Sequence, residues 1–225
     1  MVDYAVITAK DEADTIGELI DALREQGIYS VVINDGSRDD TGFIAESKGA
    51  VVIHHASPEG IARSLLEAWQ VAVNQRADRI VQLDAGGSHD PREAKRLLDA
   101  LHGYNIVIGS RFLPGSVYEG RNWRAKGSRL AAKMMNFAAT GAYRKYTLTD
   151  WTSGYRAFTK DTLKRLLRCG YYERMHPWQI EVLVEAVNLG MRFTEVPITY
   201  KAGGSSFKFR MLDGAIRQWL RMLYS

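Results

Sequence analysis

Arg79-Ile-Val-Gln-Leu-Asp-Ala-Gly-Gly-Ser-His-Asp-Pro91 is the stretch of this 225-residue chain that decides the fold. Its short apolar run, residues 80–83, ends abruptly in Asp84, two glycines and a second acid, Asp90. A buried parallel strand delivers an acidic side chain in this way to the carboxyl edge of a sheet, where open α/β folds bind ligands. The glycines let a ligand approach the backbone, and the two carboxylates can hold a cation. The stretch therefore predicts a ligand site at the end of a strand.

Strand and helix patterns alternate on both sides of this stretch through the first half of the chain. Alternation of this kind predicts an α/β fold with a doubly wound, mainly parallel sheet and helices on both faces. There is no Gly-x-Gly-x-x-Gly after the first strand and no Walker loop, which argues against a dinucleotide site or a phosphate-cradling loop. The expected strands are residues 4–8, 30–34, 50–54, 80–84 and 105–108, and the expected helices are residues 11–25, 41–48, 60–74 and 91–102.

The second half of the chain is basic and mostly helical. Residues 109–121 are expected to form a loop, and residues 192–200 a strand. Helices are expected over residues 123–139, 161–169, 178–189 and 214–224, and the first and last of these are basic and amphipathic. Because no repeat or linker interrupts the chain, we expect one domain over residues 1–225. Within it, residues 1–110 could handle a cation or a nucleotide base, and residues 111–225 could receive a polyanionic ligand.

Charge is divided unequally between these halves. Residues 1–110 hold 10 Lys and Arg against 18 Asp and Glu, and residues 111–225 hold 20 against 8, so the overall net charge of +4 conceals a strongly basic half. That half suits a polyanionic ligand, although a solvated basic surface would have the same composition. The one cysteine, Cys169, fits a reducing compartment. Without a signal peptide or a membrane-spanning apolar run, the sequence predicts a cytoplasmic protein.

Six segments, each at a strand end or a helix start, together resemble the family 2 glycosyltransferases, whose GT-A fold is Rossmann-like. Within that family they are most similar to dolichol- or polyprenyl-phosphate mannose synthases and their bacterial relatives. The resemblance runs over residues 6–210 and is specific because the segments occur in the family's order. The segments are residues 35–41 (DGSRDDT), 82–91 (QLDAGGSHDP), 108–111 (IGSR), 150–158 (DWTSGYRAF), 179–181 (QIE) and 195–199 (EVPIT).

The resemblance implies a nucleotide-sugar donor site, an anionic acceptor site and a set of catalytic residues. Asp35 is also placed to accept hydrogen bonds from a base or ribose, with capping of the next helix as its simpler role. For Glu12, nucleoside contact and a favourable charge in the first turn of a helix are equally compatible with the sequence. The implied catalytic residues are Asp84, Asp150, Glu181 and Arg111; the donor-binding residues are Thr8, Glu12, Asp35, Ser37, Gly60, Asp84, Ala85, Gly86 and Lys208; and the acceptor-binding residues are Arg111, Arg129, Ser153, Arg156 and Arg210.

Asp84 corresponds to the first acid of the family's Asp-x-Asp motif, which implies a Mg²⁺ or Mn²⁺ cofactor on the donor diphosphate. The second acid of the motif is replaced by Gly86, so Ser88, Asp90 or water would complete the metal shell. Mg²⁺ needs only one or two carboxylates, so the replacement is compatible with metal binding. His54 and His55 have no metal-like spacing and receive no function, and His89 is expected to be structural.

The implied reaction transfers a sugar with inversion at its anomeric carbon. A lipid phosphate acceptor needs no strong base, whereas a hydroxyl acceptor needs a carboxylate base such as Asp150 or Glu181. The preferred acceptor is a polyprenyl phosphate, with peripheral contact at the inner face of a membrane through the basic amphipathic helices. Two alternatives remain: a nucleic-acid acceptor such as a hydroxymethylated base, stacked on Trp123, Tyr143 or Tyr146, and a non-catalytic module that binds nucleotide sugars.

Overall fold

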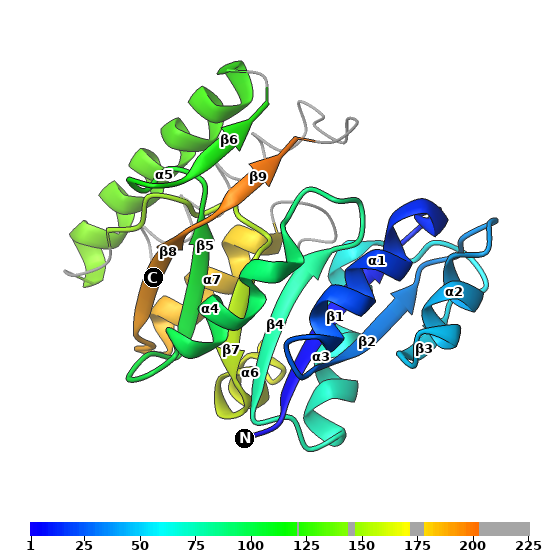
Figure 1. Cartoon of the computed structure of the whole chain (residues 1–225). Helices are drawn as coiled ribbons and strands as arrows, with labels where there is room; N and C mark the ends of the chain where they lie inside the picture. The colour runs from blue at the N-terminus through cyan, green and yellow to red at the C-terminus, as the bar shows by residue number, and fades with distance from the viewer. Residues whose placement is uncertain (121, 144–146, 172–177, 203–225) are drawn as a thin grey trace.

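A seven-stranded sheet forms the centre of the molecule in a computed structural model that describes residues 1–120, 122–143, 147–171 and 178–202. The strand order is β3-β2-β1-β4-β7-β5-β8, and β7 is the antiparallel member. This confirms the predicted mainly parallel α/β fold (Figure 1). The strands are β1 (Asp3–Ala9), β2 (Ile28–Asn34), β3 (Val51–His54), β4 (Arg79–Asp84), β5 (Ile106–Ser110), β7 (Arg156–Thr159) and β8 (Phe193–Pro197).

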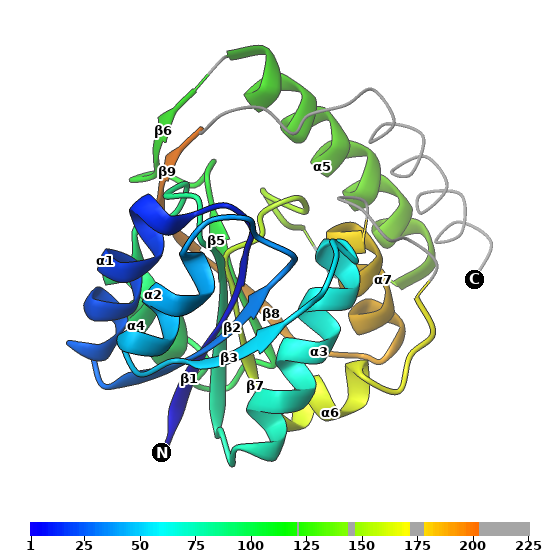
Figure 2. The same ribbon diagram turned by 90° about the vertical axis from the view of Figure 1, so that its right-hand side faces the viewer.

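Helices cover both faces of the sheet, as Figure 2 shows. On one face lie α1 (Ala13–Arg24), α2 (Thr41–Ser47) and α4 (Ala94–Asp99), the last preceded by the short 3₁₀ helix η1 (Pro91–Glu93). On the other face lie α3 (Ile61–Asn74), α6 (Lys160–Leu166) and α7 (Trp178–Asn188). Alternate strand residues point to opposite faces, so Val6 packs in the core beneath α3 while Ile7 packs in the core beneath α1. The two cores hold the strand ends in fixed positions.

The second half of the chain departs from the predicted elements in two places. The antiparallel strand β7 was not predicted, and it lies between β4 and β5, where Arg156 is in register with Gln82 and Ile108. The strand predicted over residues 192–200 is divided at Ile198. Its first part is β8, and its second part, β9 (Thr199–Lys201), pairs with β6 (Val117–Glu119), which lies within the predicted loop.

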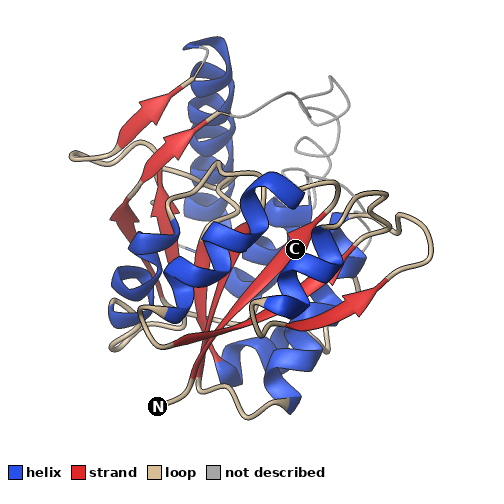
Figure 3. Ribbon diagram, turned by 45° about the vertical axis from the view of Figure 1, so that its right-hand side comes forward, coloured by secondary structure: helices blue, strands red, loops and turns tan. Residues whose placement is uncertain are grey.

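The division follows from the backbone hydrogen bonds around Ile198. Its N–H donates to the carbonyl of Ser110 in the large sheet, and its carbonyl accepts from Val117 of the small sheet. Ile198 therefore joins the two sheets. Figure 3 shows the small sheet standing above the large one beside α5 (Asn122–Tyr143), the long helix predicted over residues 123–139. The predicted terminal helix, residues 214–224, lies outside the described residues.

Candidate active site

Asp84 ends β4 at the carboxyl edge of the sheet, as the sequence predicts. Thr8 of β1 lies beside it in register. The Asp84 side chain is 40% exposed, so it is supported by the sheet and open to a ligand. On the side of β7, Gly154 is its neighbour: a Cβ atom on Gly154 would lie 3.6 Å from Asp84 Oδ2 and 3.1 Å from Gln179 Nε2. The contact with Asp84 would be an ordinary one, and the tighter contact would be with Gln179, so Gly154 lies directly beside both side chains.

Asp35 follows β2 and is held in place by three donors. Its Oδ1 accepts from His55 Nδ1 at 2.8 Å and from the Glu59 N–H at 2.8 Å, and its Oδ2 accepts from the Gly60 N–H at 3.1 Å. Burial alone would raise the pKa of Asp35, but these hydrogen bonds outweigh it and the pKa is lowered. A carboxylate has about four acceptor positions, so one on Oδ2 is left for a ligand. The ionised Asp35 is thus fixed as a hydrogen-bond acceptor.

His55 joins this site through both ring nitrogens. Its Nε2 contacts Glu67 Oε2 at 2.8 Å while Nδ1 contacts Asp35, and only 6% of its side chain is exposed. Burial lowers the pKa of His55, but the hydrogen bonds to Asp35 and Glu67 outweigh it, so the pKa is raised above 6.5. The raised pKa favours the protonated ring, which lies between two carboxylates and positions Asp35, a role that the sequence did not indicate.

We expect His55→Gln to lower the free energy of unfolding by roughly 2 kcal/mol at neutral pH and below. Because the folded-state pKa of His55 is raised, its contribution is fully present below the unfolded pKa and is lost as pH rises through the folded pKa. Urea unfolding across pH should therefore show the parent and the variant converging at alkaline pH. His54→Gln is the neighbouring control: it removes an exposed pairing with Glu46 and a contact of 3.2 Å to Asn34 Nδ2, but leaves Asp35 and Glu67 untouched. A constant difference between parent and His55→Gln at all pH values would contradict the assignment.

The start of α1 is tied to the loop after β2. The Asp11 N–H donates to Ser37 Oγ at 2.9 Å, and the Glu12 N–H donates to Thr41 Oγ1 at 2.8 Å. Burial, followed by the charges of Asp39, Asp84 and Asp11, raises the pKa of Glu12. Glu12 is therefore within electrostatic reach of the end of β4. Gly60, at φ 94°, begins α3 in a conformation that favours glycine.

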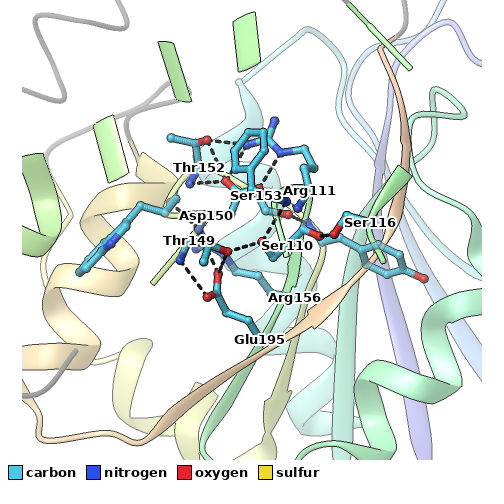
Figure 4. A network of polar contacts seen from close by, with 12 residues as sticks. Ser110, Arg111, Ser116, Thr149, Asp150, Thr152, Ser153, Arg156 and Glu195 are labelled. Carbon is cyan, nitrogen blue, oxygen red and sulfur yellow. Dashed lines mark hydrogen bonds and ion pairs between the residues drawn. The ribbon is translucent and has the colours of Figure 1, made fainter. Parts of the chain in front are cut away.

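Arg111 and Asp150 form a buried ion pair at the end of β5 (Figure 4). Arg111 Nε and Nη2 lie 2.7 Å from Asp150 Oδ2 and Oδ1, and Nη2 also donates to Thr152 Oγ1 at 2.5 Å. The aromatic rings of Phe112 and Tyr200 lie 5.3 and 5.1 Å from the guanidinium carbon. Burial would raise the pKa of Asp150, but the charge and hydrogen bonds of Arg111 lower it. Asp150 is therefore an ionised carboxylate locked to Arg111, which makes it a poor proton acceptor.

Glu195 of β8 supports this pair from below, as Figure 4 also shows. Its carboxylate accepts from the N–H groups of Thr149 and Asp150 at 2.8 and 2.9 Å and from Thr149 Oγ1 at 3.0 Å. Thr149 Oγ1 also contacts Ser110 Oγ at 2.5 Å. The loop before β7 is therefore fixed to the ends of β5 and β8. The sequence motif containing Glu195 was noticed, but no role was predicted for this residue.

Three further predicted residues are buried in the wall of the site. Arg156, with 1% exposed, donates to the carbonyls of Gln179 at 2.8 Å and Trp151 at 3.1 Å, and burial lowers its pKa to about 9. Ser153 Oγ accepts from the Tyr155 N–H at 3.3 Å, and Glu181 lies fully buried in α7. These three side chains are buried and support the surface of the site from the interior of the protein. The sequence leaves open whether Asp150 orients a hydroxyl or Arg156; in the structure Asp150 pairs with Arg111 and accepts from Thr152 Oγ1 at 3.1 Å.

The loop after Asp84 contains the residues predicted to complete a metal site. The Ala85 carbonyl accepts from Thr15 Oγ1 at 2.8 Å, and the Ser88 carbonyl accepts from the Lys201 N–H at 2.9 Å. Among the described residues, no group of three or more His, Cys, Asp or Glu side chains is arranged to hold a metal. The oxygen donors of Asp84 still suit Mg²⁺ or Mn²⁺ if ligand oxygens and water supply the other positions. The site therefore fits a cation whose coordination shell is completed by oxygens of the substrate and by water.

The predicted basic residues divide between described and undescribed parts of the chain. Arg129 is exposed on α5, with its guanidinium carbon 4.9 Å from the centre of the Phe112 ring. Lys208 and Arg210 lie outside the described residues. Across the described ranges, no helix combines the length and the apolar composition needed to cross a bilayer.

Comparison with known proteins finds similarity to sugar transferases. The family model "Glycosyl transferase family 2" matches residues 4–167. The chain is similar to undecaprenyl-phosphate mannosyltransferase of Micrococcus luteus, with 32% identity over 83% of this chain and 76% of that protein. It is also similar to polyprenol monophosphomannose synthase of Mycolicibacterium smegmatis, with 28% identity over 84% of this chain and 77% of that protein.

A solved structure supports the fold assignment. Glucosyl-3-phosphoglycerate synthase from Mycobacterium tuberculosis, in complex with Mn²⁺, uridine diphosphate and glucosyl-3-phosphoglycerate, superposes with a TM-score of 0.67. The match covers 99% of this chain and 78% of that one, at 18% sequence identity. At that identity the likeness shows a shared GT-A architecture.

Proposed function

The chain belongs to glycosyl transferase family 2 and is a glycosyltransferase, and from this premise we propose that it moves a sugar from a nucleoside diphosphate sugar to a polyprenyl phosphate. A phosphate oxygen of the acceptor forms a bond to the anomeric carbon, while the bond from that carbon to the donor diphosphate breaks. The sugar inverts its configuration, and the nucleoside diphosphate leaves. The two mannosyl-transferring relatives make mannose the first sugar to test.

The Arg111–Asp150 pair is the observation that favours a phosphate acceptor. A hydroxyl acceptor would require a carboxylate that takes up its proton, yet the pKa of Asp150 is lowered and both of its oxygens are engaged by Arg111. A phosphate is already ionised and needs no such base. Arg111 Nη1 has no hydrogen-bond partner among the described residues, so its N–H donors are left for a phosphate oxygen.

Donor binding is assigned to the carboxyl ends of β1, β2 and β4. Asp35, held by His55 and two backbone N–H groups, would accept a hydrogen bond from the nucleoside. Asp84 would hold a divalent cation, Mg²⁺ or Mn²⁺. When bound, that cation would neutralise the donor diphosphate and allow it to leave. Thr8 is in register with Asp84, and the Gly60 N–H donates to Asp35, so we assign both residues to the same donor site.

Acceptor delivery is assigned to the basic half, where α5 has a mixed polar and apolar exposed face. Lys126, Leu130, Lys133 and Phe137 follow one another at helical spacing, and Leu130 and Phe137 are 57% and 69% exposed. Exposed apolar side chains can enter a membrane surface while neighbouring basic side chains contact its anionic headgroups. We assign peripheral membrane contact to this face.

The proposed domain organisation is a single unit over residues 1–225, with nucleotide binding in residues 1–110 and acceptor binding in residues 111–225. The insertion of β7 between β4 and β5 supports it, because a strand of the second half then completes the sheet of the first. Residues 149–155, the loop before β7 that we call the acceptor loop, thereby lie beside Asp84 at Gly154.

A transfer assay tests the proposed function. The purified chain would receive GDP-mannose and a panel of UDP- and dTDP-sugars with Mg²⁺, and either polyprenyl phosphate in anionic vesicles, the same polyprenol without phosphate, or an oligonucleotide containing hydroxymethylcytosine. We expect sugar on the polyprenyl phosphate alone, with one nucleoside diphosphate released per transfer. Labelled oligonucleotide, or nucleotide binding without transfer to any acceptor, would contradict the proposal.

A further inference from the structure

The side chain of Glu12 lies directly against Gly86, two residues after Asp84. A Cβ atom on Gly86 would lie 2.9 Å from Glu12 Oε1, closer than real Cβ atoms approach another heavy atom. The Glu12 carboxylate therefore fills the place where the side chain of an acid at position 86 would begin. Glycine at position 86 therefore leaves room for the carboxylate of Glu12, which an acid at position 86 would displace.

Glu12 is held against this loop by its backbone and by Thr15. Its carbonyl accepts from the Thr15 and Ile16 N–H groups at 3.1 and 3.0 Å, which begins α1 at this point. Thr15 Oγ1 donates to the Ala85 carbonyl at 2.8 Å and lies 3.5 Å from Glu12 Oε2. One threonine thus connects the start of α1 to the residue between Asp84 and Gly86, so the two carboxylates are presented by fixed backbone segments.

His89 provides an independent sign that Asp84 is prepared for a ligand. Its side chain is 2% exposed between the rings of Tyr155 and Tyr200, whose centres lie 4.9 and 5.5 Å away. Within the part of the chain that the structure describes, its buried Nδ1 has no hydrogen-bond partner, and it lies 3.9 Å from Asp84 Oδ2. That distance is too long for a hydrogen bond, so a small movement of Asp84 would satisfy both groups. A hydrogen bond from a ring nitrogen behind a metal-binding carboxylate would orient that carboxylate.

We propose that Glu12 supplies, together with Asp84, the second carboxylate that holds the divalent cation, in place of the acid missing at position 86. The inference rests on the proposed function, because the cation is the one that neutralises the donor diphosphate. Two carboxylates, diphosphate oxygens and water form an oxygen shell that Mg²⁺ and Mn²⁺ accept. Because the protein supplies only two carboxylates, the cation should bind firmly only when the nucleotide adds its diphosphate oxygens.

Moving the carboxylate between the two positions tests the proposal. Mn²⁺ binding would be followed by electron paramagnetic resonance of the free ion, with and without nucleoside diphosphate, for the parent, Glu12→Gln, and the double variant Glu12→Ala with Gly86→Asp. We expect Glu12→Gln to weaken nucleotide-dependent Mn²⁺ binding by at least about tenfold. The double variant should recover most of that loss, because removal of the Glu12 carboxylate makes room for the new side chain. Asp14→Asn, in the exposed first turn of the same helix, is the matched control and should bind Mn²⁺ like the parent.

Two results would overturn the assignment of Glu12. One is parental Mn²⁺ affinity in Glu12→Gln; the other is no recovery in a double variant whose thermal unfolding shows that it is folded. If the parent binds no Mn²⁺ with any nucleoside diphosphate, the metal-dependent reaction itself fails along with the inference. Unchanged binding in Glu12→Gln overturns the inference and leaves the proposed function intact.

Discussion

Asp84→Asn should reduce sugar transfer by at least about a hundredfold while the protein remains folded. The substitution removes the charge that would hold the cation on the donor diphosphate, so the leaving group loses its neutralising partner. The fold should tolerate the change because the side chain is 40% exposed and its nearest basic partner, His89, is kept neutral by a burial-lowered pKa. Initial rates at saturating donor, together with thermal unfolding, would measure both effects.

The matched control for this variant is Asp78→Asn. Asp78 lies just before β4, at the opposite end of the strand from Asp84, and its side chain is 49% exposed. The Asp78→Asn variant should transfer sugar at the parental rate. Asp84→Asn rates within about threefold of the parent would remove the metal-binding role assigned to Asp84.

Asp150→Asn should lower the free energy of unfolding by about 3–5 kcal/mol, which corresponds to about 10 °C in melting temperature for a chain of this size. The variant keeps the shape of the side chain but leaves the Arg111 guanidinium, 11% exposed, without its charge partner. Urea unfolding would measure the change. Transfer should fall as well, because the loop before β7 is positioned by the same pair.

A double-mutant cycle separates the ion pair from simple loss of packing. Arg111→Met combined with Asp150→Asn should be less destabilising than the sum of the two single variants, because the second substitution removes the unpaired charge left by the first. Arg129→Met is the control, since Arg129 is exposed above the same Phe112 ring. Additive effects of the two single variants would show that the pair does not act as a unit.

The sequence was sufficient to predict the first four parallel strands, because each of β1 to β4 is an apolar run followed by a helix. β7 was missed because it follows a loop and its partners in β4 and β5 lie far away in the chain. The switch from β8 to β9 was missed for a related reason. Residues 193–201 have one continuous strand pattern, and only the hydrogen bonds of Ile198 to two different sheets divide it.

The strand-end acids could be predicted because a carboxylate directly after a buried strand has a known location. Their partners could not. Asp150 lies six residues from Arg156 in the chain, yet it pairs with Arg111, which is 39 residues away. His55 receives its role from Asp35 and Glu67, which only the folded chain brings to its two nitrogens. Side-chain pairing across loops depends on three-dimensional packing, for which the spacing of residues in the sequence gives no measure.

The insertion of β7 also determines the order in which the sheet is completed as the chain leaves the ribosome. β4 is synthesised long before β7, and β5 pairs in the described residues only with β7 and β8. A nascent chain that has released β5 therefore keeps one edge of β4 open while all of α5 is translated. Open strand edges promote pairing with other chains, so this interval is when the protein is most exposed to misassembly. Arrival of residues 156–159 closes the edge and, in the same step, brings the acceptor loop beside Asp84.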